Sequence, residues 1–313
     1  MNEQEFVHRP VLLDECIDAL AIRPDGIYLD GTLGRAGHSR EIARRLTTGR
    51  LICVDRDQAA LDAAADKLGE QMERVTLVHS NFDRLDEILD TLGIGGVNGM
   101  LFDLGVSSPQ LDDPARGFSY MQDAPLDMRM DRTDTLTART VVNEWPQEEL
   151  RRILWQYGEE RYAPAIAAAI VRARDQKTIE TTLELVDVIR CAMPPAALRE
   201  KQHPAKRTFQ AVRIAVNDEL AAVDRMVGAA VPRLVSGGRL AVISFHSLED
   251  RIVKNALAAF AKGCTCPPDF PVCVCGKKPS VRLVHKKPIV SGARELEENP
   301  RARSAKLRVA EKL

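Results

Sequence analysis

The fold is first indicated by residues Asp30-Gly31-Thr32-Leu33-Gly34-Arg35-Ala36-Gly37. This stretch follows a short aliphatic run, 26–30, and precedes a helical pattern over about 38–46. Its three glycines allow backbone to approach a ligand closely at the N-terminus of that helix. The next aliphatic run ends in Asp55, and a carboxylate there can accept both hydroxyl protons of an adenosine ribose. The pair predicts an adenosine-containing cofactor. The alternative is that the glycines only form a tight turn and Asp55 caps the next helix.

Around this stretch, aliphatic strands alternate with amphipathic helices. We expect strands at 26–30, 51–55, 74–78 and 97–101, the last continuing to Asp103, and helices at 38–46, 58–68 and 82–92. Such strands, alternating with helices of about ten residues, are typical of a parallel sheet covered on both faces. The sequence therefore predicts an α/β fold with a doubly wound, Rossmann-like sheet.

The alternation stops in the middle of the chain. Residues 104–130 are rich in Ser, Pro, Asp and Gly, and an irregular segment of that length is usually functional. Residues 135–200 then predict a wholly helical insertion, which leaves 1–134 and 201–313 as the cofactor domain. We expect one long amphipathic helix over 209–227, a strand at 239–244 and a final strand at 306–310.

Composition limits the classes of protein. The chain has 313 residues, 45% of them hydrophobic, and no apolar run near the roughly 20 residues that span a membrane. No secretory signal is visible, and seven cysteines, an odd number, favour reduced thiols in the cytoplasm. Residues 1–100 carry 11 Lys/Arg against 18 Asp/Glu, and residues 276–313 carry 11 against 4. A basic C-terminal stretch on an acidic protein suggests a polyanionic partner or, equally, a solvated tail.

The glycine spacing narrows the choice of cofactor. It is neither the G-x-G-x-x-G of nicotinamide enzymes nor the G-x-x-x-x-G-K-[ST] of nucleoside triphosphate sites. An acidic residue leading a looser glycine turn favours S-adenosylmethionine, with Asp30 facing the ammonium of its methionine end. Phe82, after the third strand, is a candidate to stack on adenine, or it packs its own helix on the sheet.

Further motifs bring in a family. In order along the chain they are Leu12-Leu13-Asp14-Glu15, the 30–39 turn, Leu104-Gly105-Val106-Ser107-Ser108-Pro109-Gln110-Leu111-Asp112, Arg116-Gly117-Phe118-Ser119-Tyr120-Met121, Pro125-Leu126-Asp127-Met128-Arg129-Met130-Asp131, Tyr157-Gly158-Glu159-Glu160-Arg161, Arg207-Thr208-Phe209-Gln210-Ala211-Val212-Arg213-Ile214, Ser244-Phe245-His246-Ser247-Leu248-Glu249-Asp250-Arg251 and Asn299-Pro300-Arg301-Ala302-Arg303-Ser304. Over nearly its whole length the chain resembles the bacterial 16S ribosomal RNA cytosine-N4 methyltransferases.

This resemblance implies a methyl donor, a substrate and a set of contacts. The donor would be S-adenosylmethionine, and the acceptor would be the N4 amine of a decoding-region cytidine in the small ribosomal subunit. The helical insertion would recognise the RNA substrate. Matched by motif position, the cofactor contacts are Ala36, Gly37, His38, Asp55, Phe82, Asp103 and Gln110. Many relatives have glycine where this chain has Ala36, which would be strained if its φ is positive.

Methylation of cytosine N4 needs a group that accepts the amine proton, because the nitrogen lone pair is delocalised into the ring. Asp103 is the first candidate, followed by Ser107 and Ser108; capping and turn formation are the alternative for the serines. His246, just past the fifth strand, is a further catalytic candidate, although a lone histidine is more often structural.

Aromatic and basic residues near these motifs are candidates for RNA contacts. Phe118, Tyr120 and Phe245 could stack on an extruded base, or belong to the core. The candidate phosphate contacts are Arg116, Arg129, Arg301 and Arg303, each of which could instead be solvated or salt-bridged.

Four cysteines gather late in the chain, as Cys264-Thr265-Cys266 and Cys273-Val274-Cys275. Four thiolates can hold a zinc ion, although C-x-C is tighter than the usual spacing of two to four residues. Thiols outside any metal site, or a redox-labile pair, are the alternatives. We expect no part for this loop in methyl transfer.

Three other functions stay open at this point. Ser107-Ser108-Pro109-Gln110 half matches the Ser/Asp-Pro-Pro-aromatic stretch of amino-methyltransferases, which leaves DNA as a possible substrate. A non-catalytic ribosome-assembly factor would bind RNA through the basic stretch and the cysteine loop. A nicotinamide dehydrogenase is the weakest rival.

Overall fold

The computed structural model describes residues 9–264, 266, 272 and 274–313, and the chain divides into two compact units. Unit 1 runs up to Gly105 and resumes at Leu220; unit 2 is Val106–Glu219. The insertion is thus wider at both ends than the expected 135–200. The reason is packing, because Phe118 and Met128 from the preceding segment and Phe209 from the following helix share the apolar core of unit 2.

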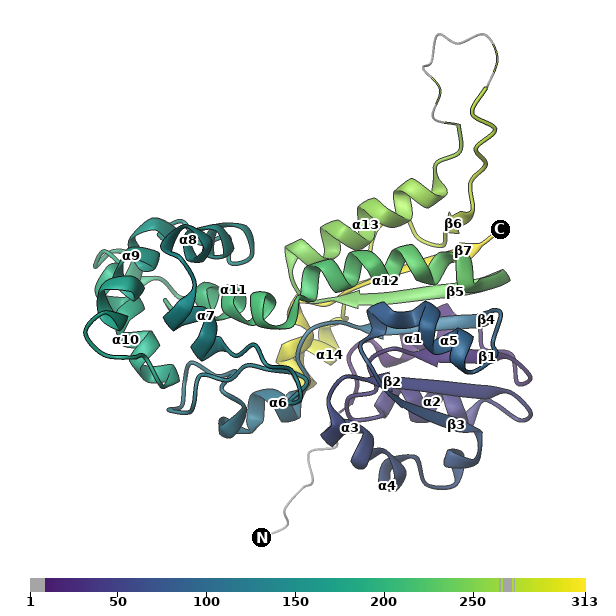
Figure 1. Ribbon diagram of the computed structural model, residues 1–313. Coiled ribbons are helices and arrows are strands. Elements are labelled where there is room, and N and C mark those ends of the chain that lie inside the picture. Colours follow the sequence, from purple (N-terminus) through teal and green to yellow (C-terminus); the bar gives the residue numbers. More distant parts are fainter. Residues whose placement is uncertain (1–8, 265, 267–271, 273) are drawn as a thin grey trace. The chain divides into compact units, whose positions relative to one another are not determined.

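Unit 1 is built on a seven-stranded sheet (Figure 1). Its strands are β1 (Ile27–Asp30), β2 (Arg50–Asp55), β3 (Val75–His79), β4 (Val97–Asp103), β5 (Leu234–Ser244), β6 (Val281–Leu283) and β7 (Lys306–Lys312). They lie in the order β3-β2-β1-β4-β5-β7-β6. The first five are parallel, as expected, whereas β7 and β6 are antiparallel additions. The basic C-terminal stretch therefore supplies two strands of the sheet, and is no mere solvated tail.

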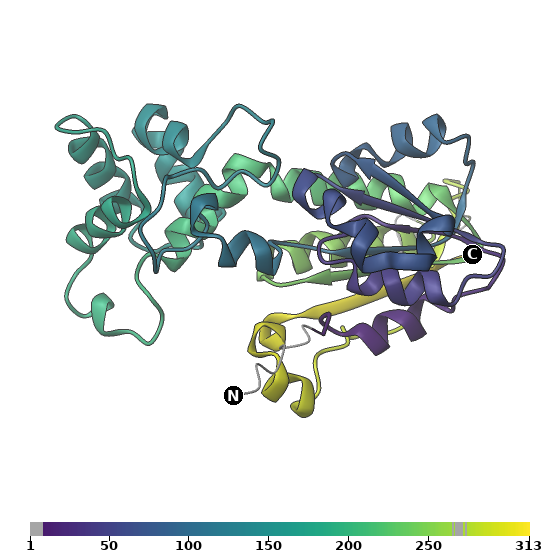
Figure 2. The same ribbon diagram turned by 90° about the horizontal axis from the view of Figure 1, so that it is seen from below.

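Helices cover both faces of this sheet (Figure 2). They are α1 (Leu13–Leu20), α2 (Gly37–Arg44), α3 (Gln58–Asp62), α4 (Ala64–Leu68), η1 (Gly69–Arg74), η2 (Phe82–Arg84), α5 (Leu85–Thr91), α12 (Glu219–Arg233), α13 (Ser247–Ala261), α14 (Ala293–Glu298) and η5 (Pro300–Ser304). Successive strand residues point to opposite faces, so Tyr28 packs with α1 and α2 while Leu29 packs with α5 and α12. This two-sided burial explains the aliphatic strands of the sequence.

Unit 2 is helical, with an irregular segment at its start. Its elements are α6 (Ser108–Asp112), η3 (Pro114–Arg116), α7 (Ala138–Glu144), α8 (Gln147–Gln156), α9 (Ala163–Arg174), α10 (Thr182–Ala192), η4 (Ala197–Arg199) and α11 (Lys206–Asn217). They enclose a core of their own, which includes Ile153, Ile166 and Ile189. The predicted helical character of the insertion is confirmed.

The single long helix expected over 209–227 is wrong. Asp218 takes a left-handed conformation, φ 49° and ψ 36°, which ends α11 before α12 begins at Glu219. The neighbouring Asn217 fixes this end, because its Oδ1 accepts from the Met130 amide (2.8 Å) and its Nδ2 donates to the Met128 carbonyl (2.8 Å). Aspartate is among the few residues that tolerate this conformation.

Among the described residues, none of the helices combines the length and the apolar character needed to cross a membrane.

Candidate active site

The strand order reverses between β1 and β4, and at such a point the carboxyl ends of the strands leave a crevice for a ligand. Each of three neighbouring strands ends there in a carboxylate: Asp30 on β1, Asp55 on β2 and Asp103 on β4. Unit 1 thus places three acidic side chains at one edge of its sheet.

Asp30 organises the glycine turn from beneath. It is 1% exposed. One carboxylate oxygen accepts from the Ser39 hydroxyl (2.6 Å) and the other from the Thr32 amide (3.1 Å). Burial raises the pKa of Asp30, and these hydrogen bonds act against that rise. The turn thus encloses the oxygens of Asp30, and the expected contact with a methionine ammonium stays a prediction.

Asp55 holds the turn from the side. Its two oxygens accept from the Gly34 amide and the Asp57 amide, each at 2.8 Å. Burial raises the pKa of this carboxyl to about 6. A carboxylate oxygen can accept more than one hydrogen bond, so a ribose contact at Asp55 stays a prediction.

Ala36 has a positive φ, so the strain expected for an alanine in that conformation is present. Its φ of 59° and ψ of 20° place it in the left-handed region at the N-cap of α2, where it supplies no capping side chain. The next residue must be glycine, because a Cβ on Gly37 would lie 2.2 Å from Cγ of Pro10. The turn is therefore pressed against the segment that precedes α1.

His38 lies in the first turn of α2 and points at Asp103. Its Nε2 lies 3.0 Å from the Val11 carbonyl, which can only accept, so Nε2 carries the proton and Nδ1 the lone pair in the neutral ring. Nδ1 lies 3.8 Å from Oδ2 of Asp103. Burial lowers the pKa of His38, which favours this neutral form.

Asp103 combines a fixed backbone with an unsatisfied side chain. Its amide donates to the Thr32 hydroxyl (2.6 Å). Its Oδ1 is buried and has no hydrogen-bond partner within the part of the chain that the structure describes. Burial, followed by the charges of Asp30 and Glu249, raises the pKa of Asp103 to about 8. A carboxyl with that pKa can take up or release a proton close to neutral pH.

His246 and Glu249 form the opening turn of α13, in a reciprocal capping arrangement. Oε2 of Glu249 accepts from the amides of Phe245 (2.8 Å) and His246 (3.2 Å), and Nδ1 of His246 accepts from the Glu249 amide (3.4 Å). His246 Nε2 also lies 3.2 Å from Oε1 of Glu249. His246 thus caps α13, but its Nε2 is buried without a hydrogen-bond partner among the described residues, and its catalytic role stays a prediction. Phe245 is half-buried against the core, and its base contact stays a prediction.

Sequence reasoning missed three residues of this edge. Thr32 joins β1 to β4, and Glu249 fixes the backbone after β5. Asn81 follows β3, and its side-chain oxygen is buried without a hydrogen-bond partner among the described residues. Only its place beside Phe82 at a strand end could have indicated it. The Phe82 ring meets Phe102 edge to face at 5.8 Å, which is the packing role; adenine stacking stays a prediction.

In unit 2, Ser107 and Gln110 cap α6. The Ser107 hydroxyl accepts from the Gln110 amide (3.4 Å), and the Gln110 side-chain oxygen accepts from the Ser107 amide (3.0 Å). The capping alternative for Ser107 is confirmed. Ser108, half-buried in the first turn, and Gln110, which is buried, remain predicted contacts.

Three of the expected RNA contacts, Arg116, Phe118 and Arg129, have partners within unit 2. The Arg116 guanidinium is buried and donates to the carbonyls of Arg129 and Met130, both at 2.9 Å. Phe118 lies in the apolar core, with Arg116 over its ring. Arg129 donates two hydrogen bonds to the Asp127 carboxylate, through Nε and Nη2. Its Nη1 donates to the carbonyls of Arg132 and Asp134. These side chains hold the irregular segment together, and their RNA contacts stay predictions.

The remaining candidates differ in exposure. One face of the Tyr120 ring stacks on His203 at 4.6 Å, and Phe209 meets it edge-on. Arg301 and Arg303 are exposed on η5. Their RNA contacts stay predictions.

The cysteine loop lies after α13, away from the carboxyl edge. Three of its members, Cys264, Cys266 and Cys275, have their sulfurs within 4.8 Å of one another. The fourth, Cys273, lies outside the described residues. Because α13 has 15 residues, the loop is about 20 Å from the edge where the helix begins.

Known proteins match the whole chain. Residues 5–313 match the model of the MraW methylase family. The ribosomal RNA small subunit methyltransferase H of Symbiobacterium thermophilum is 57% identical over 98% of this chain and 97% of its own. Its namesake in Brevibacillus brevis is 56% identical over the full length of both, and that of Heliobacterium mobile is 55% identical over 99% and 100%. With its carboxylate-lined edge and a match of this extent, the chain belongs to the MraW methylase family.

Proposed function

We propose that this protein transfers a methyl group from S-adenosylmethionine to the exocyclic N4 amine of a decoding-region cytidine in 16S ribosomal RNA. The observation that carries the proposal is the buried, unsatisfied Oδ1 of Asp103 at the switch point of the sheet. The relatives named as small-subunit rRNA methyltransferases support the class of substrate.

The residues present fit the cofactor. Asp55 retains lone pairs for the ribose hydroxyls, and Phe82 and Asn81 lie after β3, beside the strand that Asp55 ends. The close backbone of 31–37 and the N-terminus of α2 suit the methionine end. When bound, S-adenosylmethionine supplies an electrophilic methyl group on a positively charged sulfur.

The chain's own contribution is to orient the amine and receive its proton. Asp103 Oδ1 accepts one N4–H, which draws electron density toward the nitrogen and fixes its direction of attack. As the C–N bond forms, the surplus proton passes from N4 to Asp103. His38 Nδ1 lies 3.8 Å from Oδ2 of Asp103 and helps to hold the carboxyl in position during the proton transfer. Thr32 fixes the backbone that carries Asp103.

Recognition of RNA falls to other parts of the chain. Arg301 and Arg303 are exposed in the basic C-terminal stretch, which suits a polyanion. We assign substrate recognition to the helical unit. The proposed substrate is the small ribosomal subunit, in the cytoplasm. Zinc at the cysteine loop would have no step in this transfer, given the length of α13.

The test is methyl transfer from radiolabelled S-adenosylmethionine to small subunits that lack the modification, followed by nucleoside analysis. The expected product is N4-methylcytidine in 16S rRNA, with Asp66→Asn, at an exposed carboxylate, as the active control. Naked 16S rRNA and duplex DNA are run in parallel. Label in DNA alone, or no label although the cofactor binds, would contradict the proposal.

A further inference from the structure

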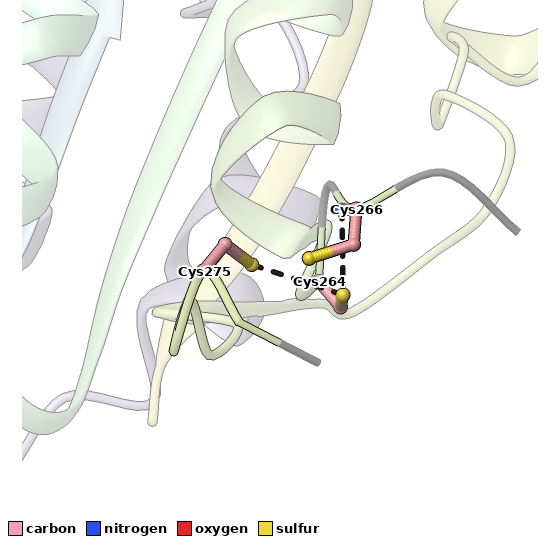
Figure 3. A group of neighbouring side chains, drawn as sticks. All are labelled: Cys264, Cys266 and Cys275. Carbon is pink, nitrogen blue, oxygen red and sulfur yellow. Dashed lines mark hydrogen bonds between the residues drawn. The ribbon is translucent and has the colours of Figure 1, made fainter. Parts of the chain in front are cut away.

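The loop between α13 and β6 brings together cysteines that are eleven residues apart in sequence. The Sγ atoms of Cys264 and Cys275 lie 3.7 Å from each other, and Cys266 places its sulfur within 4.8 Å of both (Figure 3). The methyl-transfer chemistry uses none of these thiols.

The base of the loop is held closed by the fold. The Ser280 amide donates to the Phe260 carbonyl at 2.9 Å. Gly263 lies so near Pro279 that a Cβ there would come within 3.1 Å of the proline ring. Cys264 follows Gly263 directly, and Gly276, with a φ of 61°, turns the chain after Cys275. The two arms therefore present their thiols to each other before any ligand arrives.

The distances suit a metal better than a disulfide. A tetrahedral zinc site with Zn–S bonds of about 2.3 Å needs sulfurs about 3.8 Å apart, close to the 3.7 Å between Cys264 and Cys275. A disulfide would need about 2.0 Å. The Cys266 amide also donates to Cys264 Sγ at 3.4 Å, which fixes the position of that sulfur.

We propose that Cys264, Cys266 and Cys275 bind a structural zinc ion that closes this loop. Three thiolates supply most of a tetrahedral shell, and each thiol releases its proton to solvent as the metal binds. Cys273, two residues before Cys275, lies outside the described residues, so the site is defined by the three described sulfurs. The ion fixes the described residues of this loop, of which Val272 and Val274 are exposed.

The test measures zinc in the full-length, untagged protein, purified under reducing conditions without chelator. We expect about one zinc per chain in the parent. Cys264→Ser and Cys275→Ser should each lower this to less than about a fifth. Cys191→Ser is the matched control, because Cys191 is an exposed cysteine of α10 in the other unit, and it should retain the parent value.

Two measurements guard against misfolded variants and oxidised thiols. Cobalt(II) added to the metal-free parent should give a thiolate-to-cobalt charge-transfer band and the strong visible bands of tetrahedral cobalt. A Cys264–Cys275 disulfide in the reduced preparation, a parent that takes up no zinc, or octahedral cobalt without the charge-transfer band would each overturn the proposal. So would zinc retained in both serine variants.

Discussion

Two irregular segments of this protein are held in opposite ways. In the turn 30–39, carboxylates lie beneath and beside the chain, and Asp30 and Asp55 accept its backbone amides. In the segment 113–132, cationic and amide side chains lie inside, and Arg116 and Asn217 donate to its carbonyls.

The difference explains why only one of them is suited to a cationic cofactor. The first segment lies at the sheet edge beside Asp55 of β2 and Asp103 of β4, two carboxyls whose pKa values are raised. The second directs its positive groups into its own backbone, which leaves little for an external phosphate. Arginine in a motif is thus weak evidence for RNA contact until its partners are known.

The largest effect is expected at the acidic edge. Asp103→Asn keeps the shape but cannot accept the amine proton, so kcat should fall roughly 100- to 1,000-fold. The affinity for S-adenosylmethionine, measured by calorimetry, should change only a few-fold. Asp66→Asn on α4 is the matched control and should keep its activity; a comparable loss there would show that the assay reports folding.

The same carboxyl should make stability depend on pH. Its pKa in the folded protein, about 8, lies above the ordinary 3.8. Its stabilising contribution is therefore complete below about pH 4 and is lost as the pH rises through about 8. Asp103→Asn removes that loss. Between these pH values, the free energy of unfolding of the variant should therefore rise relative to that of the parent by on the order of a few kcal/mol. Urea unfolding at several pH values measures this, and a constant difference would contradict the assigned pKa.

The segment 113–132 should lose stability when the Arg116 guanidinium, which donates to its carbonyls, is removed. Arg116→Met leaves two carbonyls without the guanidinium and should lower the free energy of unfolding by about 3 kcal/mol. Arg132→Met, at an exposed position in the same segment, should cost less than about 0.5 kcal/mol. Equal losses in the two variants would remove the distinction between the segments.

The smallest effect is expected at Ala36, in the glycine turn. Ala36→Gly relieves a left-handed alanine and should raise the free energy of unfolding by about 0.5–1 kcal/mol. Ala65→Gly, at an exposed position inside α4, should lower it by about 1 kcal/mol. If Ala36→Gly destabilises to the same extent, the turn is not under strain.

The fold was predictable where burial produces a regular pattern of apolar residues in the sequence. Two-sided burial makes the strands aliphatic, and the alternation with helices indicated the doubly wound sheet. The break at Asp218 was not predictable, since the apolar spacing of Phe209, Val212, Val223 and Val227 carries on across it. A single left-handed residue interrupts the helix without disturbing that pattern.

The site was predictable in part. Asp55 and Asp103 follow from their positions at strand ends. The structural role of Asp30 was not predictable, because the sequence cannot show that Ser39 and Thr32 donate to its oxygens. The structural role of Arg116 was not predictable, because its partners are backbone carbonyls, which every residue carries and no motif distinguishes.

Whether Asp103 accepts the amine proton is tested most directly by kinetics. The measurement is the pH dependence of kcat/KM for S-adenosylmethionine, with saturating small subunits. This ratio reports ionisations of the enzyme before the cofactor binds. In the parent we expect kcat/KM to rise with pH through an apparent pKa near 8, and we expect no such rise in the residual activity of Asp103→Asn. A profile that is flat across this range, or a rise that persists in the variant, would contradict it.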